Sequence, residues 1–142
     1  MIIREVEAGD AAAVAKLSGE LGYPVSTEAM RSRIQARYRF PDHVVYVACQ
    51  SDVIVGWIDV GIVHHLQADP CGEIGGLVVS SEHRSSGIGR QLVGRAEQWV
   101  KDRGFSTMRV RSRISREAAH RFYERAGYEH TKTSAVFTKC LL

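Results

Sequence analysis

The sequence predicts one α+β domain built on a central, twisted mixed sheet of six to seven strands with about four helices. Three observations predict it. The chain has 142 residues, of which 44% are hydrophobic and 25% charged, which suits one domain with one core. β-Rich runs come first as a meander, and later strands alternate with helices. No repeat, low-complexity tract or linker divides the chain, so we expect a single domain over residues 1–142.

The N-terminal region is expected to contribute one strand and two helices. The alternating run "MIIREVE" predicts a strand. Asp10 is placed to cap a helix over about residues 11–21. Ser26 then opens a second helix over about residues 27–38.

The middle of the chain is expected to be a hairpin followed by a fourth strand. "HVVYVACQ" and "VIVGWIDVGIVHH" predict two strands joined by a turn at "SD". "GEIGGLVVS" predicts the next strand, and its paired glycines allow two interpretations. Gly75 and Gly76 either mark a bulge with close backbone approach, or leave room for a bulky neighbouring side chain.

The C-terminal region is expected to alternate helix and strand. The apolar stripe over residues 87–103 predicts a helix, and "STMRVRS" predicts a strand. Ser115 is placed to cap a helix over residues 116–126. The tail "YEHTKTSAVFTKCL" predicts one or two further strands.

Composition excludes several classes of protein. The first ten residues carry charge too early for a signal peptide, and the longest apolar run is too short for a membrane helix and contains Asp59. Three widely spaced cysteines do not form a disulfide framework, so we expect a cytoplasmic protein. The net charge of +3 suits an anionic ligand, whereas the basic stretch "RVRSRISR" lacks the interleaved aromatics of nucleic-acid binding. Alternation along a strand would place Arg109, Arg111 and Arg113 of that stretch on one face, which is either a solvated strand edge or a site for a phosphate.

The run "HRSSGIGRQLV" places two glycines between a strand and a helix. The first N–H groups of a helix lack internal partners, so this arrangement can bind an anion. A nucleoside-triphosphate loop would need Gly-Lys-Ser/Thr, and a dinucleotide loop would need a small residue where Leu92 stands. Neither fits, and a simple packing turn stays open as an alternative.

Two motifs together resemble the GNAT superfamily of acyl-CoA-dependent N-acetyltransferases. The first is Gln/Arg-x-x-Gly-x-Gly/Ala before a helix, met by Arg84, Gly87 and Gly89. The second lies on the following helix, and its matching residues are Ala119, Phe122, Tyr123, Gly127 and Tyr128. "GEIGGLVV", "AHRFYERAGYE" and "FTK" are also similar to the aminoalkylphosphonate branch and to some aminoglycoside and other small-amine acetyltransferases.

The resemblance implies acetyl-CoA as co-substrate and a cofactor site in the splay between the fourth and fifth strands. Backbone groups of the fourth strand would hold pantetheine, and the glycine loop would hold the pyrophosphate. The implied cofactor-binding residues are Leu77, Val78, Val79, Arg84, Ser85, Ser86, Gly87, Ile88, Gly89, Arg90, Arg116 and Tyr123. Many family members have glycine where Ser85 stands, so Ser85 must adopt a backbone conformation that glycine makes easy.

The resemblance also implies two catalytic residues. Tyr123 would protonate the leaving thiolate, because a phenol is well matched to a thiol. Glu73 would accept the proton of the amine through water, with His64 or His65 as the alternative base. His64, His65, Asp69 and Cys71 lack the closed spacing of a zinc site, so no metal is expected.

The acceptor implied by the resemblance is a primary amine of a small molecule, attacking the thioester directly. A protein or peptide acceptor and a non-catalytic acyl-CoA sensor are the alternatives. Because GNAT proteins are often dimers, a homodimer is expected, and neither nucleic acid nor membrane is an expected partner.

Overall fold

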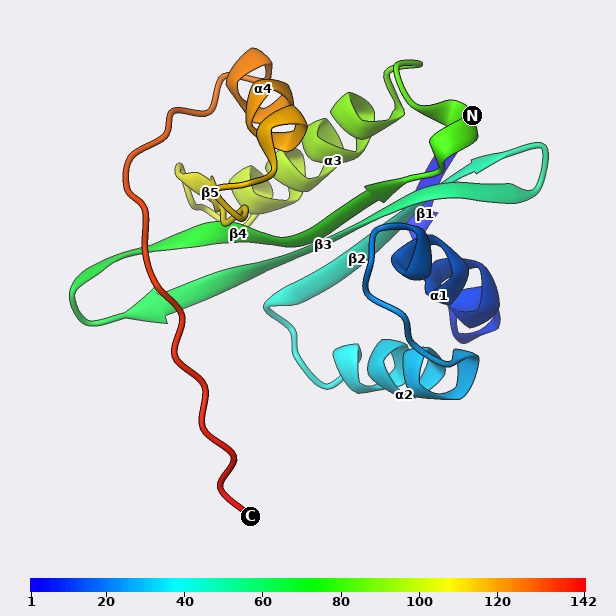
Figure 1. Cartoon of the computed structure of the whole chain (residues 1–142), viewed down its shortest axis with the longest axis horizontal. Helices are drawn as coiled ribbons and strands as arrows, with labels where there is room; N and C mark the ends of the chain where they lie inside the picture. The colour runs from blue at the N-terminus through cyan, green and yellow to red at the C-terminus, as the bar shows by residue number, and fades with distance from the viewer. The chain divides into compact units, whose positions relative to one another are not determined.

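The computed structural model describes all residues, 1–142, as two compact units, Met1–Val110 and Arg111–Leu142. The first unit contains five strands and three α-helices, and the second contains one α-helix and the C-terminal segment (Figure 1). The elements in chain order are β1 (Ile2–Glu5), α1 (Ala11–Glu20), α2 (Thr27–Arg37), β2 (His43–Gln50), β3 (Val53–His65), β4 (Ala68–Val79), α3 (Ile88–Asp102), β5 (Met108–Val110) and α4 (Glu117–Arg125). Short 3-10 turns occupy Ala8–Asp10 and Ser81–His83.

The sheet is mixed, as predicted, but has five strands rather than six to seven. Strands β1 to β4 form an antiparallel meander, and β5 joins β4 in parallel. The tail after α4 contains no strand, so the prediction of one or two strands there is wrong. An alternating sequence supplies the side-chain pattern of a strand, but a strand also needs a partner for its backbone groups.

Helices cover both faces of the sheet in the first unit (Figure 1). On one face, α1 and α2 pack with β2 in a core that includes Val14, Ile34 and Val47. On the other face, Leu92 of α3 lies against Gly56 of β3, where a Cβ would come within 3.1 Å of its Cδ1 atom. Residues alternate between these two faces along each strand.

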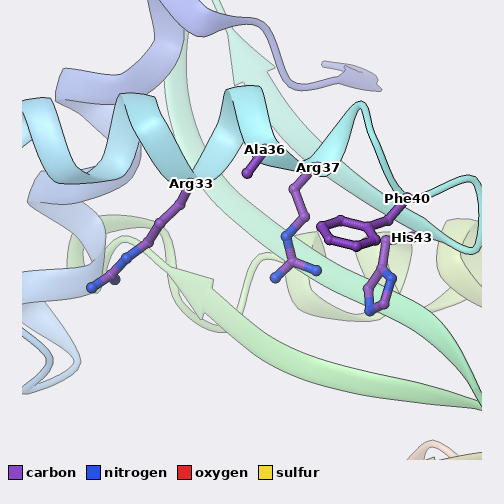
Figure 2. Close-up of a pocket in the computed structure, with 5 residues that line it drawn as sticks. All are labelled: Arg33, Ala36, Arg37, Phe40 and His43. Atoms are coloured by element: carbon purple, nitrogen blue, oxygen red, sulfur yellow. The ribbon is translucent and has the colours of Figure 1, made fainter. Parts of the chain in front are cut away.

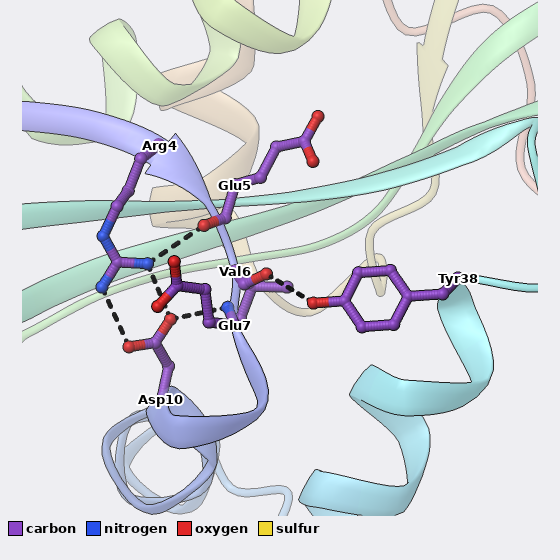
Figure 3. A network of polar contacts seen from close by, with 6 residues as sticks. All are labelled: Arg4, Glu5, Val6, Glu7, Asp10 and Tyr38. Atoms are coloured by element: carbon purple, nitrogen blue, oxygen red, sulfur yellow. Dashed lines mark hydrogen bonds and ion pairs between the residues drawn. The ribbon is translucent and has the colours of Figure 1, made fainter.

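An ion pair fixes the start of the chain (Figure 3). The Arg4 guanidinium donates to both carboxylate oxygens of Asp10, at 2.8 and 2.9 Å. Asp10 also accepts the Glu7 N–H at 2.7 Å. Its side chain makes no capping hydrogen bond to α1, so the prediction that Asp10 caps this helix is wrong. The Tyr38 hydroxyl donates to the Val6 carbonyl at 3.1 Å and ties the end of α2 to the segment after β1.

Of the other predicted turns and caps, the Ser26 cap and the hairpin turn are confirmed, and the Ser115 cap is wrong. Ser26 caps α2 by accepting the Ala29 N–H at 3.0 Å, as predicted. The hairpin turn lies at Ser51 and Asp52, whose φ values of 49° and 65° fit the type I′ turns of two-residue hairpins. Ser115 does not cap α4, because Arg116 occupies the N-cap position without a side-chain cap bond. No helix is both long and apolar enough to span a bilayer.

Candidate functional site

Strand β4 contains a bulge at Gly75. Asp59 of β3 pairs with Gly76 and Val60 pairs with Ile74, so Gly75 has no opposite residue on β3. An extra residue of this kind bends the strand and raises its local twist. The interpretation of the paired glycines as a bulge is therefore confirmed.

The bulge coincides with the end of the pairing between β4 and β5. Strand β5 pairs with β4 only along residues Gly72–Ile74. From Gly75 onward β4 keeps β3 on one edge and has no β5 partner on the other. Leu77, Val78 and Val79 lie in this segment. Its open edge presents backbone N–H and C=O groups that an extended ligand can pair with as a strand would.

The second glycine of the pair, Gly76, leaves room for the Trp57 side chain. A Cβ on Gly76 would lie 3.0 Å from the Trp57 ring, so glycine also makes room for a bulky neighbour. Both interpretations of the glycine pair therefore apply, one to each residue. The Trp57 Nε1 atom is buried and has no hydrogen-bond partner.

The loop after β4 is held by its own hydrogen bonds. Arg84 Nε donates to the Val79 carbonyl at 3.4 Å, and the Ser86 hydroxyl donates to the His83 carbonyl. Ser85 has φ of 68° and Gly87 has φ of 85°, both in the left-handed region. The expectation that Ser85 adopts a conformation suited to glycine is confirmed.

The N-terminus of α3 is open to an anion. Its first hydrogen bond runs from the Gln91 N–H to the Gly87 carbonyl at 3.1 Å, so the amides of Ile88 and Gly89 precede the helical pattern. Nothing lies within 4 Å of a Cβ position on Gly87. The Ile88 side chain is buried, so this residue can contribute only its backbone, whereas Arg90 is exposed.

Glu73 lies at the last pairs between β4 and β5. Arg109 Nε donates to Glu73 Oε1 at 2.8 Å, and the two residues are register partners across the strands. The preceding Gly72 faces Val100 of α3, so alternation places Glu73 on the opposite face, the one that α1 and α2 cover. The side chain is 23% exposed, which leaves it accessible while holding it in a fixed ion pair.

A second carboxylate, Asp59, which no sequence motif marks, lies on the same face. Arg37 Nη2 of α2 donates to Asp59 Oδ2 at 2.5 Å. A Cβ on Gly75 would lie 2.9 Å from the same oxygen, so Asp59 covers the bulge. Burial raises the pKa of Asp59, and the positive charge of Arg37 opposes that rise. The available signal was a lone acid inside the apolar run "VIVGWIDVGIV".

A hollow of about 300 Å³ opens beside this ion pair (Figure 2). Its lining residues come from α2, the segment after it and the start of β2, and they are Arg33, Ala36, Arg37, Phe40 and His43. The His43 ring lies over Gly61, where a Cβ would come within 2.5 Å of it. Gly61 is the β3 register partner of Glu73. The hollow therefore shares Arg37 with the Asp59 ion pair, and its His43 lies over the register partner of Glu73.

The alternative bases, His64 and His65, are both exposed, and His64 lies near Asp42. His64 Nε2 lies 3.5 Å from Asp42 Oδ2, and its side chain is 58% exposed. Arg103 also pairs with Asp42 at 2.6 Å and holds the pKa of that carboxyl below its usual range. His65 is exposed at the end of β3. The structure contains no group of three or more histidine, cysteine or acidic side chains that could hold a metal ion.

The second unit carries Tyr123 on α4. Its ring lies edge-on to Phe122 and Tyr128, with centroids 5.2 and 5.8 Å away. Burial raises the pKa of Tyr123, so the phenol stays protonated over a wider pH range. At the start of the helix, the Arg116 carbonyl accepts the His120 N–H at 3.1 Å.

The basic stretch does not form the expected strand face. Strand β5 ends at Val110, so only Arg109 of the arginines belongs to it. The prediction that alternation along one strand aligns Arg109, Arg111 and Arg113 is therefore wrong.

Comparison with known proteins gives consistent results. The family model described as "Acetyltransferase (GNAT) family" matches residues 12–128. The chain is 34% identical to the aminoalkylphosphonate N-acetyltransferase of Salmonella typhimurium over 88% of this chain and 78% of that protein. It is 28% identical to aminoglycoside N(6′)-acetyltransferase type 1 of Stenotrophomonas maltophilia, over 95% and 90% of the two chains.

Solved structures show the same fold. An aminoglycoside 6′-N-acetyltransferase from Acinetobacter haemolyticus superposes with a TM-score of 0.86 and 17% identity, over 99% of each chain. Another aminoglycoside N-acetyltransferase, solved in complex with CoA, gives 0.84 and 17% over 98% of this chain and 99% of that one. The bulge, the open helix N-terminus and these matches lead to one conclusion: the chain belongs to the GNAT acetyltransferase family.

Proposed function

We propose that this protein moves the acetyl group of acetyl-CoA to a primary amine of a small molecule by direct attack of the amine. Membership of the GNAT family makes it an acetyl-CoA-dependent N-acetyltransferase. The observation that carries the rest is the bulge at Gly75, where β5 pairing ends and one edge of β4 becomes available. A reaction of this type needs both substrates held close beside such an edge.

The residues around the open edge fit coenzyme A. Backbone groups of Leu77, Val78 and Val79 would pair with the pantetheine arm, and the loop from Arg84 to Arg90 would bind the pyrophosphate. The empty space over Gly87 and the position of the Ile88 and Gly89 amides before the first helical hydrogen bond support this role. Acetyl-CoA supplies the electrophilic thioester when bound. Arg116 is proposed to add a positive charge for a phosphate of the same molecule.

Two protein groups are proposed to handle protons and charge. Tyr123 would donate its hydroxyl proton to the departing thiolate, and burial raises its pKa, so the phenol carries the proton at neutral pH. A β4 amide near Val78 would donate a hydrogen bond to the developing oxyanion. Glu73 is accessible on the face of the sheet that α1 and α2 cover, and it would receive the amine proton through water.

The acceptor is proposed to be a small amine that enters over the hollow beside α2. Two relatives, an aminoalkylphosphonate N-acetyltransferase and an aminoglycoside N-acetyltransferase, support small amines as a class. A hollow of about 300 Å³ suits a small molecule.

Thiol release from acetyl-CoA tests the proposal. The purified protein is assayed with a panel of aminoalkylphosphonates, aminoglycosides, diamines and short peptides. We expect amine-dependent release of thiol with at least one small amine. Peptides outcompeting every small amine would show a protein acceptor, and binding of acetyl-CoA without turnover of any amine would show a sensor.

We further propose that both units act as one domain in the cytoplasm, as a homodimer. The family match spans residues 12–128 and so includes parts of both units. Light scattering of the purified protein measures the oligomeric state, and a monomer at all concentrations would remove the dimer from this proposal.

A further inference from the structure

We propose that Asp59, held by Arg37 beside the bulge, binds the ammonium group of the acceptor and receives its proton. This inference rests on the proposed function. It gives Asp59 the proton-accepting role assigned above to Glu73, and it names the acceptor as an amine that arrives protonated.

The position of Asp59 is the first support. Its Oδ2 atom covers Gly75, whose missing side chain leaves the backbone exposed at the point where β4 loses its β5 partner. The thioester is proposed to lie along this same open segment of β4, with its carbonyl oxygen at an amide near Val78. Asp59 faces the start of that segment, because its register partner on β4 is Gly76, and an amine bound by Asp59 would approach the thioester from that end.

The surroundings of Asp59 are the second support. The side chain is 19% exposed, and the charged or titratable groups that face it are Arg37 from α2 and His43 from β2. Glu73 lies on the same face of β4, diagonally across the bulge. Burial in this setting raises the pKa of Asp59. A carboxylate with a raised pKa is a stronger base for an ammonium than one of ordinary pKa.

The hollow is the third support. Arg37 forms part of its wall (Figure 2), and the same guanidinium donates to Asp59, so the hollow and this carboxylate share Arg37. The His43 Nδ1 atom at the other side is buried without a hydrogen-bond partner.

The proton step is simple. The N–H bond of the ammonium breaks, an O–H bond forms on Asp59, and the amine keeps the electron pair with which it attacks. The proton then leaves Asp59 for solvent before the next turnover. Arg37 keeps the carboxylate ionised until the ammonium arrives, because its charge favours the anionic form.

The pH dependence of kcat/KM tests this role, with the amine turned over fastest in the panel as the acceptor. For wild type we expect a plateau above the pKa of Asp59. Asp59→Asn should fall about 100-fold or more at neutral pH and then rise about tenfold per pH unit, because only free amine can react. Asp59→Glu should recover part of the rate.

Two further variants and a binding measurement separate an effect on the Asp59 carboxylate from a loss of folding. Arg37→Gln removes the charge that lowers the pKa of Asp59, so its acid limb should move to higher pH. Arg31→Gln, an exposed arginine on the same helix, should leave the profile unchanged. The stabilisation of each variant by acetyl-CoA shows whether the fold and the cofactor site persist.

The outcomes are separable. A wild type that releases no thiol with any amine overturns the proposed function and this inference with it. A wild type that turns over, with Asp59→Asn either close to its rate or slower by the same factor at every pH, overturns the inference alone. A Glu73→Gln enzyme that loses the plateau while Asp59→Asn keeps it would assign the proton to Glu73.

Discussion

Arg109 and Glu73 join β5 to β4 at the middle of the three register pairs between these strands, two residues before the bulge at Gly75. The bond from Arg109 Nε to Glu73 Oε1 measures 2.8 Å, and both side chains are partly shielded from solvent. The ion pair therefore links the two strands one pair before their pairing ends.

A double-mutant cycle measures how much the Arg109–Glu73 ion pair contributes to the free energy of unfolding. Arg109→Gln, Glu73→Gln and the double variant are unfolded with urea. Because the pair is only partly exposed, we expect a coupling free energy of about 0.5–1 kcal/mol. The control is the same cycle in 1 M salt, which should reduce the coupling. Additive effects of the two changes would show that the bond contributes nothing to stability.

Ser85 is expected to be a site where glycine stabilises the protein. Its φ of 68° is costly for a residue with a Cβ atom. Ser85→Gly should raise the free energy of unfolding by up to about 1 kcal/mol, after the extra backbone entropy of glycine is subtracted. Ser86→Gly is the matched control and should destabilise, since Ser86 has no positive φ and donates to His83. Equal losses from both changes would contradict the strain at Ser85.

Tyr123 is expected to act in turnover rather than in cofactor binding. Tyr123→Phe should lower kcat by about 100-fold or more, because the leaving thiolate loses its proton donor. Stabilisation by acetyl-CoA should stay the same. Tyr23→Phe, an exposed tyrosine in the first unit, is the control and should be fully active. A Tyr123→Phe enzyme with the wild-type kcat would remove the general-acid role.

The Arg4–Asp10 pair predicts a pH-dependent contribution to stability. Hydrogen bonding to Arg4, with help from the Glu7 N–H, holds the pKa of Asp10 below its ordinary value. A lowered pKa in the folded state stabilises above the unfolded pKa, and this stability is lost as pH falls from about 4 toward 2.

Asp10→Asn measures that contribution. The variant should be less stable than wild type by on the order of 1 kcal/mol at pH 7, and the difference should shrink to near zero by about pH 2. Asp69→Asn, an exposed position on the β3–β4 hairpin, should show no such trend. A difference that stays constant with pH would mean that packing, not charge, is lost.

Local patterns in the sequence predicted most of the first unit. The bounds of β2 and β3 agree with the runs "HVVYVACQ" and "VIVGWIDVGIVHH", because each run is bounded by turn residues. Ser26 caps α2 because its side chain needs only a neighbouring amide. These features depend on contacts a few residues apart.

Features that depend on a competing or a distant partner were not predicted. Asp10 bonds Arg4 across the first turn instead of capping α1, and the tail forms no strand because alternation does not supply a pairing partner. The importance of Asp59 appears only when Arg37 and Gly75 are brought to it by the fold. The motifs located the glycine loop and Tyr123, whereas the acceptor side had no motif to mark it.

Thermal unfolding with and without saturating acetyl-CoA tests the central claim, that β4 and the glycine loop form a coenzyme A site. A ligand present at 100 times its Kd should stabilise the fold by about 2.7 kcal/mol, which is several degrees in Tm for a domain of this size. Gly87→Ala, which puts a Cβ at φ of 85°, should lower that shift. A clear shift in wild type that shrinks in Gly87→Ala is the predicted result. An unchanged Tm at saturating acetyl-CoA would contradict the site.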